Sequence, residues 1–315
     1  MNYTKLNNLL GWLTFSIAFF IYYLTIEPTV SFWDCGEYIS TAYKLEVGHP
    51  PGAPFFQLLG RFFSLFALET NNVAFMINIM SAMCSAFAIL FLFWTITALS
   101  KKISTKTNNK LTLEQKIVVF GSALVGSLAY TFSDSFWFSA TEGEVYAMSS
   151  TFTAITFWAI LKWENESDDK HAARWIILIA YLIGLSIGVH LLNLLAIPAL
   201  IFIYYFKKYE ATKLGVFKVF VLAIIITGGI QGIIIPQIVN FAKGFELFFV
   251  NTIGLPFNSG TIIYFALIIA GIVFGLKYAK KKNKHGMGIA LVSFATILIG
   301  YSTFFILVIR SNANT

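Results

Sequence analysis

Long apolar runs recur along the chain, with shorter polar segments between them. A helix that crosses a bilayer needs about 20 apolar residues, because the hydrocarbon core is about 30 Å thick. No period-two alternation of the kind that indicates strands stands out. We therefore predict an all-α polytopic membrane protein with about nine transmembrane helices. In chain order these are Leu9–Ile26, Val73–Leu99, Ile117–Phe138, Val145–Leu161, two within Trp175–Phe206, Val219–Val239, Thr261–Leu276 and Met287–Ile309.

The run Trp175–Phe206 is too long for one span. Its roughly 32 residues would make a helix about 48 Å long at 1.5 Å per residue, which exceeds the core thickness of about 30 Å. We expect the chain to turn at Gly188–Asn193, which leaves two short spans. A further loop is expected at Asn240–Gly260, on the same side as that turn.

The longest polar stretch, Glu27–Asn72, follows the first span. It contains two amphipathic pieces, Gly36–Val47 and Ala53–Leu68, which are typical of helices in the membrane interface. No internal repeat or low-complexity tract divides the sequence. We expect residues 1–315 to form a single membrane module whose outer loop, residues 27–72, carries the active site.

Composition and charge support the membrane class. Hydrophobic residues make up 57% of the chain and charged residues 12%, whereas soluble domains have roughly 45–50% and about 25%. The net charge of +7 would suit a nucleic acid, but 18 of the 22 Lys and Arg residues fall in one set of loops. Membrane insertion produces this asymmetry. It predicts a cytoplasmic N-terminus, an outward 27–72 loop and no nucleic-acid partner, with four basic residues outside: Lys44, Arg61, Lys243 and Arg310.

Asp34 and Glu37 are the catalytic candidates. A carboxylate at the membrane surface can act as a general base when it lies within hydrogen-bond reach of the proton it removes. It can also bind a divalent metal ion. The spacing equally fits a capping box, with Asp34 as the N-cap and Glu37 at N3 of a short helix. The residues alone leave both interpretations open.

His49 and Arg61 are candidates for substrate binding in the same loop. His49 precedes Pro50–Pro51, which fix a non-helical turn. It could contact a phosphate or a metal ion near the acids, or simply belong to the turn. Arg61 lies on an apolar helix near the headgroups, where it could bind a lipid phosphate, extend to water or pair with Glu69.

A second group of acids lies in the next outer loop. Asp134, Glu142 and Glu144 fall within eleven residues of one another. They could form a metal site with Asp34, or they could be solvated loop charges. Glu144 directly precedes an apolar run and could face the interior of the bundle.

Three further polar residues occur late in the chain. His190 and Asn193 stand inside an apolar stretch, where polar groups are costly and often mark sites. They could equally belong to a turn solvated by headgroups. Arg310 ends the last span and could bind a phosphate or anchor the interface. The substrate-binding candidates are thus His49, Arg61, Glu142, Glu144, His190, Asn193 and Arg310, with metal ligands unknown.

Motifs for nucleotide chemistry are absent from the sequence. It has no Walker loop, no GxGxxG unit after a strand, no HExxH and no paired CxxC. We therefore expect the energy for any reaction to come from an activated lipid donor or a gradient, unless the protein needs no energy source.

Several motifs resemble a known family. A first span followed by an outward loop with an acid and two surface helices is similar to the GT-C superfamily of glycosyltransferases, which use polyprenyl-phosphate sugars. More narrowly, four segments resemble bacterial relatives of the vertebrate transmembrane protein O-mannosyltransferase. These segments are FWDCGEYISTAYKLEVGHPPGAPFFQLLGRFFSLF, SFWFSATEGEVYAMSSTF, GLSIGVHLLNLLAIPAL and YSTFFILVIRSNAN.

The resemblance implies sugar transfer with inversion at the anomeric carbon. Asp34 would deprotonate or orient a Ser or Thr hydroxyl of an exported protein. The donor would be a mannose-type sugar on polyprenyl phosphate, and Arg61 or Arg310 would stabilise the phosphate leaving group. The site would face the periplasm from a bacterial inner membrane, among membrane lipids. No cofactor is certain, and a divalent metal ion is an option.

Family members generally continue into more membrane segments and a soluble helical region, so we expect a truncated or minimal version here. Two other functions stay open. A transporter or flippase for a lipid-linked sugar would need a polar path through the bundle, yet the polar candidates gather near one face. A non-catalytic membrane subunit of a glycosylation complex is the third possibility.

Overall fold

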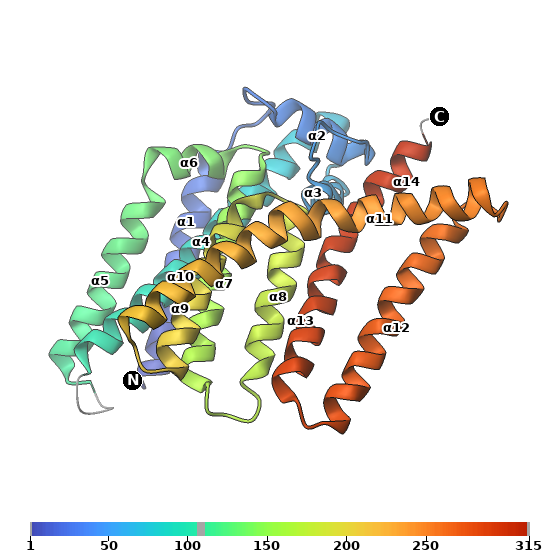
Figure 1. The fold of residues 1–315 in the computed structure, drawn as a ribbon. Helices are drawn as coiled ribbons and strands as arrows, with labels where there is room; N and C mark the ends of the chain where they lie inside the picture. The colour runs from blue at the N-terminus through green and yellow to red at the C-terminus, as the bar shows by residue number, and fades with distance from the viewer. Residues whose placement is uncertain (1, 106–110, 314–315) are drawn as a thin grey trace.

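The computed structural model describes residues 2–105 and 111–313, and every regular element within these ranges is helical (Figure 1). The α-helices are α1 (Tyr3–Leu24), α2 (Cys35–Lys44), α3 (Pro54–Ser64), α4 (Val73–Ser104), α5 (Leu113–Thr131), α6 (Asp134–Thr141), α7 (Val145–Glu166), α8 (Ala173–Ile187), α9 (Ala196–Lys208), α10 (Lys213–Gly229), α11 (Ile235–Leu247), α12 (Ser259–Lys281), α13 (His285–Tyr301) and α14 (Phe305–Ala313). Short 3-10 or π segments lie between some of them: η1 (Thr70–Asn72), η2 (Leu191–Leu195), η3 (Ile230–Ile234), η4 (Phe248–Thr252) and η5 (Ser302–Phe304).

Six helical stretches of the described chain are long and apolar enough to cross a membrane, or seven if the bent pair α5 and α6 is one span. They cover 3–24, 70–104, 191–208, 213–252, 259–281 and 285–310. The all-α polytopic class is confirmed, with fewer such spans than the nine predicted. All nine apolar runs fall in helices, but α8 has only 15 residues, about 22 Å of helix. α7 ends in the polar run KWENE.

The predicted loop Asn240–Gly260 is wrong over most of its length. α10 continues through the π turn η3 into α11 and η4, so one helical stretch of 40 residues extends from 213 to 252. At 1.5 Å per residue it is about 60 Å long, twice the roughly 30 Å hydrocarbon core. It runs obliquely across the bundle (Figure 1). The π turn ends two residues before Pro236, whose missing N–H interrupts regular helical hydrogen bonding.

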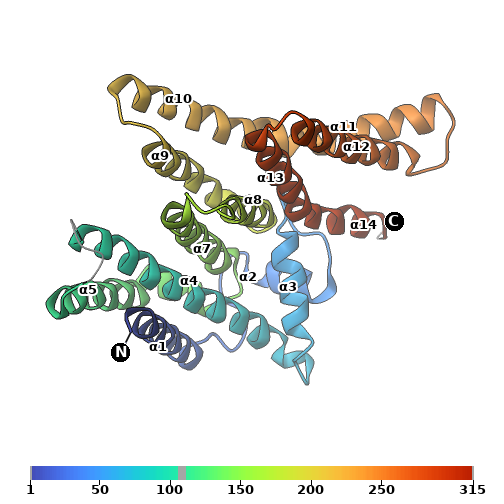
Figure 2. The same cartoon turned by 90° about the horizontal axis from the view of Figure 1, so that it is seen from below.

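α4 lies at the centre of the N-terminal half. α1 and α5 pack on one side of it and α7 on the other (Figure 2). Its side chains Ile77, Met80, Ile89 and Phe93 are fully buried. α4 is therefore the rigid element against which the first outer loop is anchored.

α8 and α13 approach each other unusually closely at two glycines. A Cβ added to Gly184 would collide with the backbone of Ile297, and one added to Gly300 would collide with the backbone of Leu185. Small residues at such contacts let helix backbones pack directly, as is common in membrane proteins. This contact joins the C-terminal helices to the rest of the bundle.

The two ends of the bundle differ in charge. α2, α3 and α6 lie at one end, whereas the N-terminus and the α7–α8 and α12–α13 connections lie at the other (Figure 1). Lys280 and Lys281 close α12 at that second end. The outer-loop helices therefore occupy the end away from these basic connections.

Candidate functional site

The segment that leads to the site is fixed to α4 by one buried amide. Asn78 is fully buried, and its Nδ2 donates to the carbonyl oxygens of Glu27 (2.7 Å) and Thr29 (3.0 Å). The backbone N–H of Glu27 also donates to the carbonyl of Thr141 at 3.1 Å. These bonds hold the chain between α1 and α2, so they fix where α2 begins.

Asp34 occupies the N-cap position of α2, but its side chain makes no capping hydrogen bond within the described chain. The capping-box interpretation of Asp34 and Glu37 is therefore wrong. The Glu37 side chain instead contacts His49, which lies in the loop between α2 and α3. As a result, the carboxylate of Asp34 is not used by the helix.

His49 lies between two carboxylates. Its Nδ1 is 2.9 Å from Glu37 Oε2, and its Nε2 is 3.9 Å from Asp34 Oδ2. The backbone N–H of His49 also donates to Glu37 Oε1 at 2.5 Å. A Cβ at Gly48 would lie 3.1 Å from that oxygen, so a side chain there would crowd the contact.

The contact between Glu37 and His49 shifts the pKa of both side chains. The hydrogen bond from His49 lowers the pKa of Glu37, and the hydrogen bond to Glu37 raises the pKa of His49. Because Glu37 holds Nδ1, Nε2 is the nitrogen turned toward Asp34. An imidazole oriented in this way can exchange a proton with Asp34 or help it bind a cation. One ligand atom from each of Asp34, Glu37 and His49 lies within 4.8 Å of the others, which is compatible with a divalent metal ion.

Glu142 and Glu144 lie in the turn between α6 and α7 and are 4% and 6% exposed. Burial, followed by the charges of Glu142 and Asp34, raises the pKa of Glu144 to about 7. Burial also raises the pKa of Glu142, although hydrogen bonds from Ser31 and Cys35 oppose the rise. The charge of Asp34 thus acts on Glu144, whereas the metal-competent group found among the described residues is Asp34, Glu37 and His49 and contains neither Glu142 nor Glu144. Asp134 lies exposed in the first turn of α6, outside the metal-competent group found among the described residues.

Two tyrosines of this site, Tyr38 and Tyr146, were not predicted from the sequence. The Tyr38 ring packs against His49 with centroids 5.8 Å apart. Burial, then the charges of Asp34 and Glu144, raises the pKa of Tyr38 to about 12. Tyr146 packs against His190 at 5.5 Å. Tyr38 follows Asp34 by four residues, so helical spacing could have placed it on the same face of α2.

His190 and Asn193 lie at the turn predicted between α8 and α9. The turn approaches the site because the N–H of Phe55 in α3 donates to the carbonyl of Gly188 at 2.8 Å. His190 Nδ1 accepts from the N–H of Leu192, and burial lowers the His190 pKa. Asn193 is fully buried and donates to Ser186 Oγ at 3.0 Å. His190 therefore borders the site through Tyr146, whereas Asn193 holds the turn from within.

Arg61 and Arg310 both bind the C-terminal end of α2. Arg61 donates to the carbonyl of Tyr43 at 2.8 Å, and Arg310 donates to the carbonyl of Leu45 at 2.7 Å. The last carbonyls of a helix lack internal partners and carry partial negative charge, so two guanidinium groups stabilise them. No ion pair joins Arg61 to Glu69 among the described side chains. The two arginines thus hold the helix that begins at Asp34.

Comparison with known proteins identifies relatives of this chain. Residues 34–213 match the family model described as "Protein O-mannosyl-transferase TMEM260 N-terminal domain". A protein O-mannosyl-transferase tmem260 of Dictyostelium discoideum is 31% identical over 179 residues, which is 55% of this chain and 20% of that protein. Protein O-mannosyl-transferase TMEM260 of Mus musculus is 26% identical over 170 residues, 53% of this chain and 21% of that protein. The matches thus span about a fifth of these relatives. No solved structure matches the chain.

Proposed function

Because the chain belongs to the family of the protein O-mannosyl-transferase TMEM260 N-terminal domain, we propose that it transfers a mannose to hydroxyl groups of proteins. The donor is a polyprenyl-phosphate sugar, and the acceptors are Ser or Thr side chains of exported proteins. The relatives are named protein O-mannosyl-transferases. A GT-C-type membrane bundle provides the scaffold.

Asp34 is the general base of this reaction. Its carboxylate removes the proton of the acceptor hydroxyl while the hydroxyl oxygen bonds to the anomeric carbon. The bond from that carbon to the phosphate oxygen breaks at the same time, and polyprenyl phosphate leaves with the electron pair. Attack on the face opposite the leaving group inverts the anomeric configuration.

The observation that carries this role is that Asp34 is the N-cap of α2 yet makes no capping bond within the described chain. An N-cap aspartate usually gives one oxygen to the helix. Here the carboxylate faces the Nε2 of His49 at 3.9 Å instead. His49, held by Glu37, orients Asp34 and can accept the proton that Asp34 takes up.

The raised pKa of Glu144 reduces the negative charge near the phosphate leaving group. A phosphate leaving group would be repelled by a site with several negative carboxylates. The pKa of Glu144, at about 7, leaves this group largely protonated at slightly acidic pH. A protonated carboxyl donates a hydrogen bond, so Glu144 can bind a sugar hydroxyl without adding a full charge.

The charge distribution supports an outward-facing site. The basic ends of the helices face the cytoplasm by the positive-inside rule. The α2–α3 end then faces outward, which for a bacterial inner membrane is the periplasm. Protein acceptors reach the site there after export.

The test replaces the base and a matched acid outside the cluster. Asp34→Asn keeps the shape of the side chain, and Asp134→Asn is the control, because Asp134 is exposed. The assay measures mannose transfer from a polyprenyl-phosphate mannose donor to a Ser- and Thr-containing peptide. We expect Asp34→Asn to lose about 100-fold or more of the rate, as is typical for a general base, and Asp134→Asn to stay near wild type. Wild-type rates in Asp34→Asn would refute the role of Asp34.

A further inference from the structure

Two exposed aromatic side chains directly precede Asp34. Phe32 is 83% exposed and Trp33 is 88% exposed, which makes them the two most exposed aromatic side chains of the described chain. Neither ring has a hydrogen-bond or ring partner among the described residues. Aromatic side chains usually bury about 150–250 Å² each. The two rings therefore leave an uncovered aromatic surface beside the candidate base.

The backbone of Trp33 adopts an unusual conformation. Its φ of 62° lies in the left-handed region, where a bulky side chain is an outlier. Asp34 follows with φ −81° and ψ −2°, whereas an N-cap residue is typically extended. A tryptophan that only anchors a protein in the interface needs no such backbone, and backbones of this kind cluster at functional sites. The conformation therefore points to a role for Trp33 at the site.

The end of α2 that carries Asp34 is rich in acids. After burial, the charges of Glu142 and Asp34 raise the pKa of Glu144, and the charge of Glu27 raises the pKa of Glu142. His49 lies beside Asp34, but it already pairs with a carboxylate. Negative charge is therefore in excess around Asp34.

The two arginines expected on the outer side lie too far along α2 to offset this charge. Arg61 donates to the carbonyl of Tyr43, and Arg310 donates to the carbonyl of Leu45. These carbonyls follow Asp34 by nine residues or more, which is about 14 Å of helix at 1.5 Å per residue. Salt screens exposed charges over about 8–10 Å. The arginines therefore act on the C-terminal end of α2.

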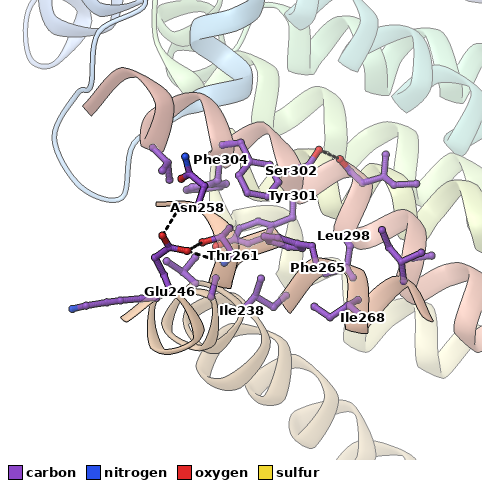
Figure 3. Close-up of a pocket in the computed structure, with 18 of the residues that line it drawn as sticks. Ile238, Glu246, Asn258, Thr261, Phe265, Ile268, Leu298, Tyr301, Ser302 and Phe304 are labelled. Atoms are coloured by element: carbon purple, nitrogen blue, oxygen red, sulfur yellow. Dashed lines mark hydrogen bonds between the residues drawn. The ribbon is translucent and has the colours of Figure 1, made fainter. Parts of the chain in front are cut away.

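The two lysines expected on the outer side also lie elsewhere. Lys44 ends α2 and pairs with Glu46 at 3.8 Å. Lys243 lies on α11, which packs against α12, and it lines an apolar pocket between these helices and the α13–α14 segment. In that pocket Glu246 accepts hydrogen bonds from Thr261 (Figure 3). The negative charge at the start of α2 is thus left for a ligand to offset.

We infer that Phe32 and Trp33 form an acceptor-binding surface that recognises a Lys or Arg two residues from the target Ser or Thr of an extended peptide. The inference rests on the proposed function, in which the acceptor is a protein. Side chains two residues apart in an extended peptide point to the same face, about 7 Å from each other. A hydroxyl at Asp34 therefore places the basic side chain within reach of the adjacent Trp33 ring.

Two physical effects favour a basic side chain on this surface. Aromatic faces attract cations, and tryptophan does so most strongly. The carboxylates around Asp34 add a Coulomb attraction. The same carboxylates repel anionic lipid headgroups, so a bilayer is the less suitable occupant of the two rings.

The test measures the binding of labelled peptides to the protein in nanodiscs by fluorescence anisotropy. The peptides share one Ser and differ at the position two residues from it, which is Lys, Gln or Glu. A fourth peptide carries the Lys directly next to the Ser. We expect the wild-type protein to bind the first Lys peptide about tenfold more tightly than the Gln peptide, within the range for a cation on an aromatic ring. The Glu peptide should bind most weakly, and the fourth peptide should resemble the Gln peptide.

Variants of Trp33 separate the ring from the backbone. Trp33→Gly removes the ring and keeps the left-handed backbone, which glycine adopts freely. This variant should reduce the preference for Lys over Gln to about twofold or less, whereas Trp33→Phe should keep most of it, because the aromatic face stays. Phe217→Ala on α10 is the control, since Phe217 is also exposed, at 62%. Its preference should equal that of wild type.

Three results would overturn the inference. The first is equal binding of the Lys, Gln and Glu peptides by the wild-type protein. The second is an unchanged preference for Lys in Trp33→Gly. The third is quenching by brominated lipids of the fluorescence that Trp33→Phe loses, because it would place the Trp33 ring in the bilayer.

Binding and chemistry fail separately in this design. Equal mannose transfer to the three peptides, with transfer lost in Asp34→Asn, would remove the inference alone. A wild-type protein that transfers no mannose, but binds the Lys peptide with a preference that depends on Trp33, would remove the proposed reaction and leave the peptide-binding surface.

Discussion

The buried carboxyl of Glu144 should make the protein less stable as the pH rises. Burial raises its pKa from 4.5 to about 7 in the folded protein. Between these two values the folded state binds more protons than the unfolded state, so the free energy of unfolding falls with increasing pH. One pKa unit is worth about 1.4 kcal/mol, so ionising Glu144 costs the fold about 3 kcal/mol at pH 8.

Glu144→Gln tests this magnitude directly. The glutamine has nearly the same shape and never ionises, so we expect the variant to be more stable than wild type at pH 8 by up to about 3 kcal/mol. At pH 4, where Glu144 is protonated in both states, the two proteins should differ little. The measurement is reversible unfolding in mixed micelles at a series of pH values, with the exposed Glu69→Gln as the control.

Glu142 changes the expected size of the pH effect on stability but not its direction. It is buried beside Glu144 and has a raised pKa of its own, so the two carboxyls titrate as a pair. The double variant with glutamine at both Glu142 and Glu144 should therefore gain less stability at pH 8 than the sum of the gains of the two single variants. A wild-type protein that is as stable at pH 8 as at pH 5, with no gain in Glu144→Gln, would refute the reasoning.

Four other changes test the support of the site and the packing. Glu37→Gln should lower stability by about 1 kcal/mol or less, because the pair is half-exposed. The loss of stability should be largest between about pH 4.5 and 6.5, because in this window Glu37 is ionised and His49 is protonated even in the unfolded protein. The loss should fade below the lowered pKa of Glu37, where Glu37 is protonated, and above the raised pKa of His49, where His49 is neutral. Asn78→Ala should cost about 1–3 kcal/mol by removing a buried amide and its hydrogen bonds to the carbonyls of Glu27 and Thr29, and it should slow transfer. Gly184→Ala should cost about 1–3 kcal/mol by overpacking against α13, whereas Gly228→Ala, with no described atom within 4 Å of the new Cβ, should stabilise α10.

Each of these outcomes can fail in a recognisable way. A pH-independent loss in Glu37→Gln would mean that the carboxylate–imidazole pair does not form. Full activity and stability in Asn78→Ala would show that the loop before α2 is held by other contacts. Equal thermal unfolding of the Gly184→Ala and Gly228→Ala variants would contradict the close approach of α8 and α13.

The local pattern of the sequence predicted the outer-loop helices well. The amphipathic pieces Gly36–Val47 and Ala53–Leu68 appear as α2 and α3, shorter by a few residues. The turn at Gly188–Asn193 also appears, because α8 ends at Ile187. Periodicity within one segment depends only on neighbours in the chain, so it can be read without knowing the fold.

Contacts between distant segments could not be read in the same way. Glu37 and Asp34 have the spacing of a capping box, but His49, twelve residues on, takes the carboxylate of Glu37. The helix beyond Asn240 was missed because polar residues end the apolar run, although Lys243 and Glu246 keep helical spacing. Whether a polar residue ends a helix or lies on one face of it depends on tertiary packing.

The bond between Arg310 and Leu45 joins residues 265 positions apart. During synthesis, α2 leaves the ribosome long before the arginine that binds its last carbonyls. The segment that matches the family model, residues 34–213, also lacks that arginine. The C-terminal end of α2 is therefore fully bonded only once α14 reaches its place, and a nascent chain without α14 holds Asp34 on a helix whose far end is only partly secured.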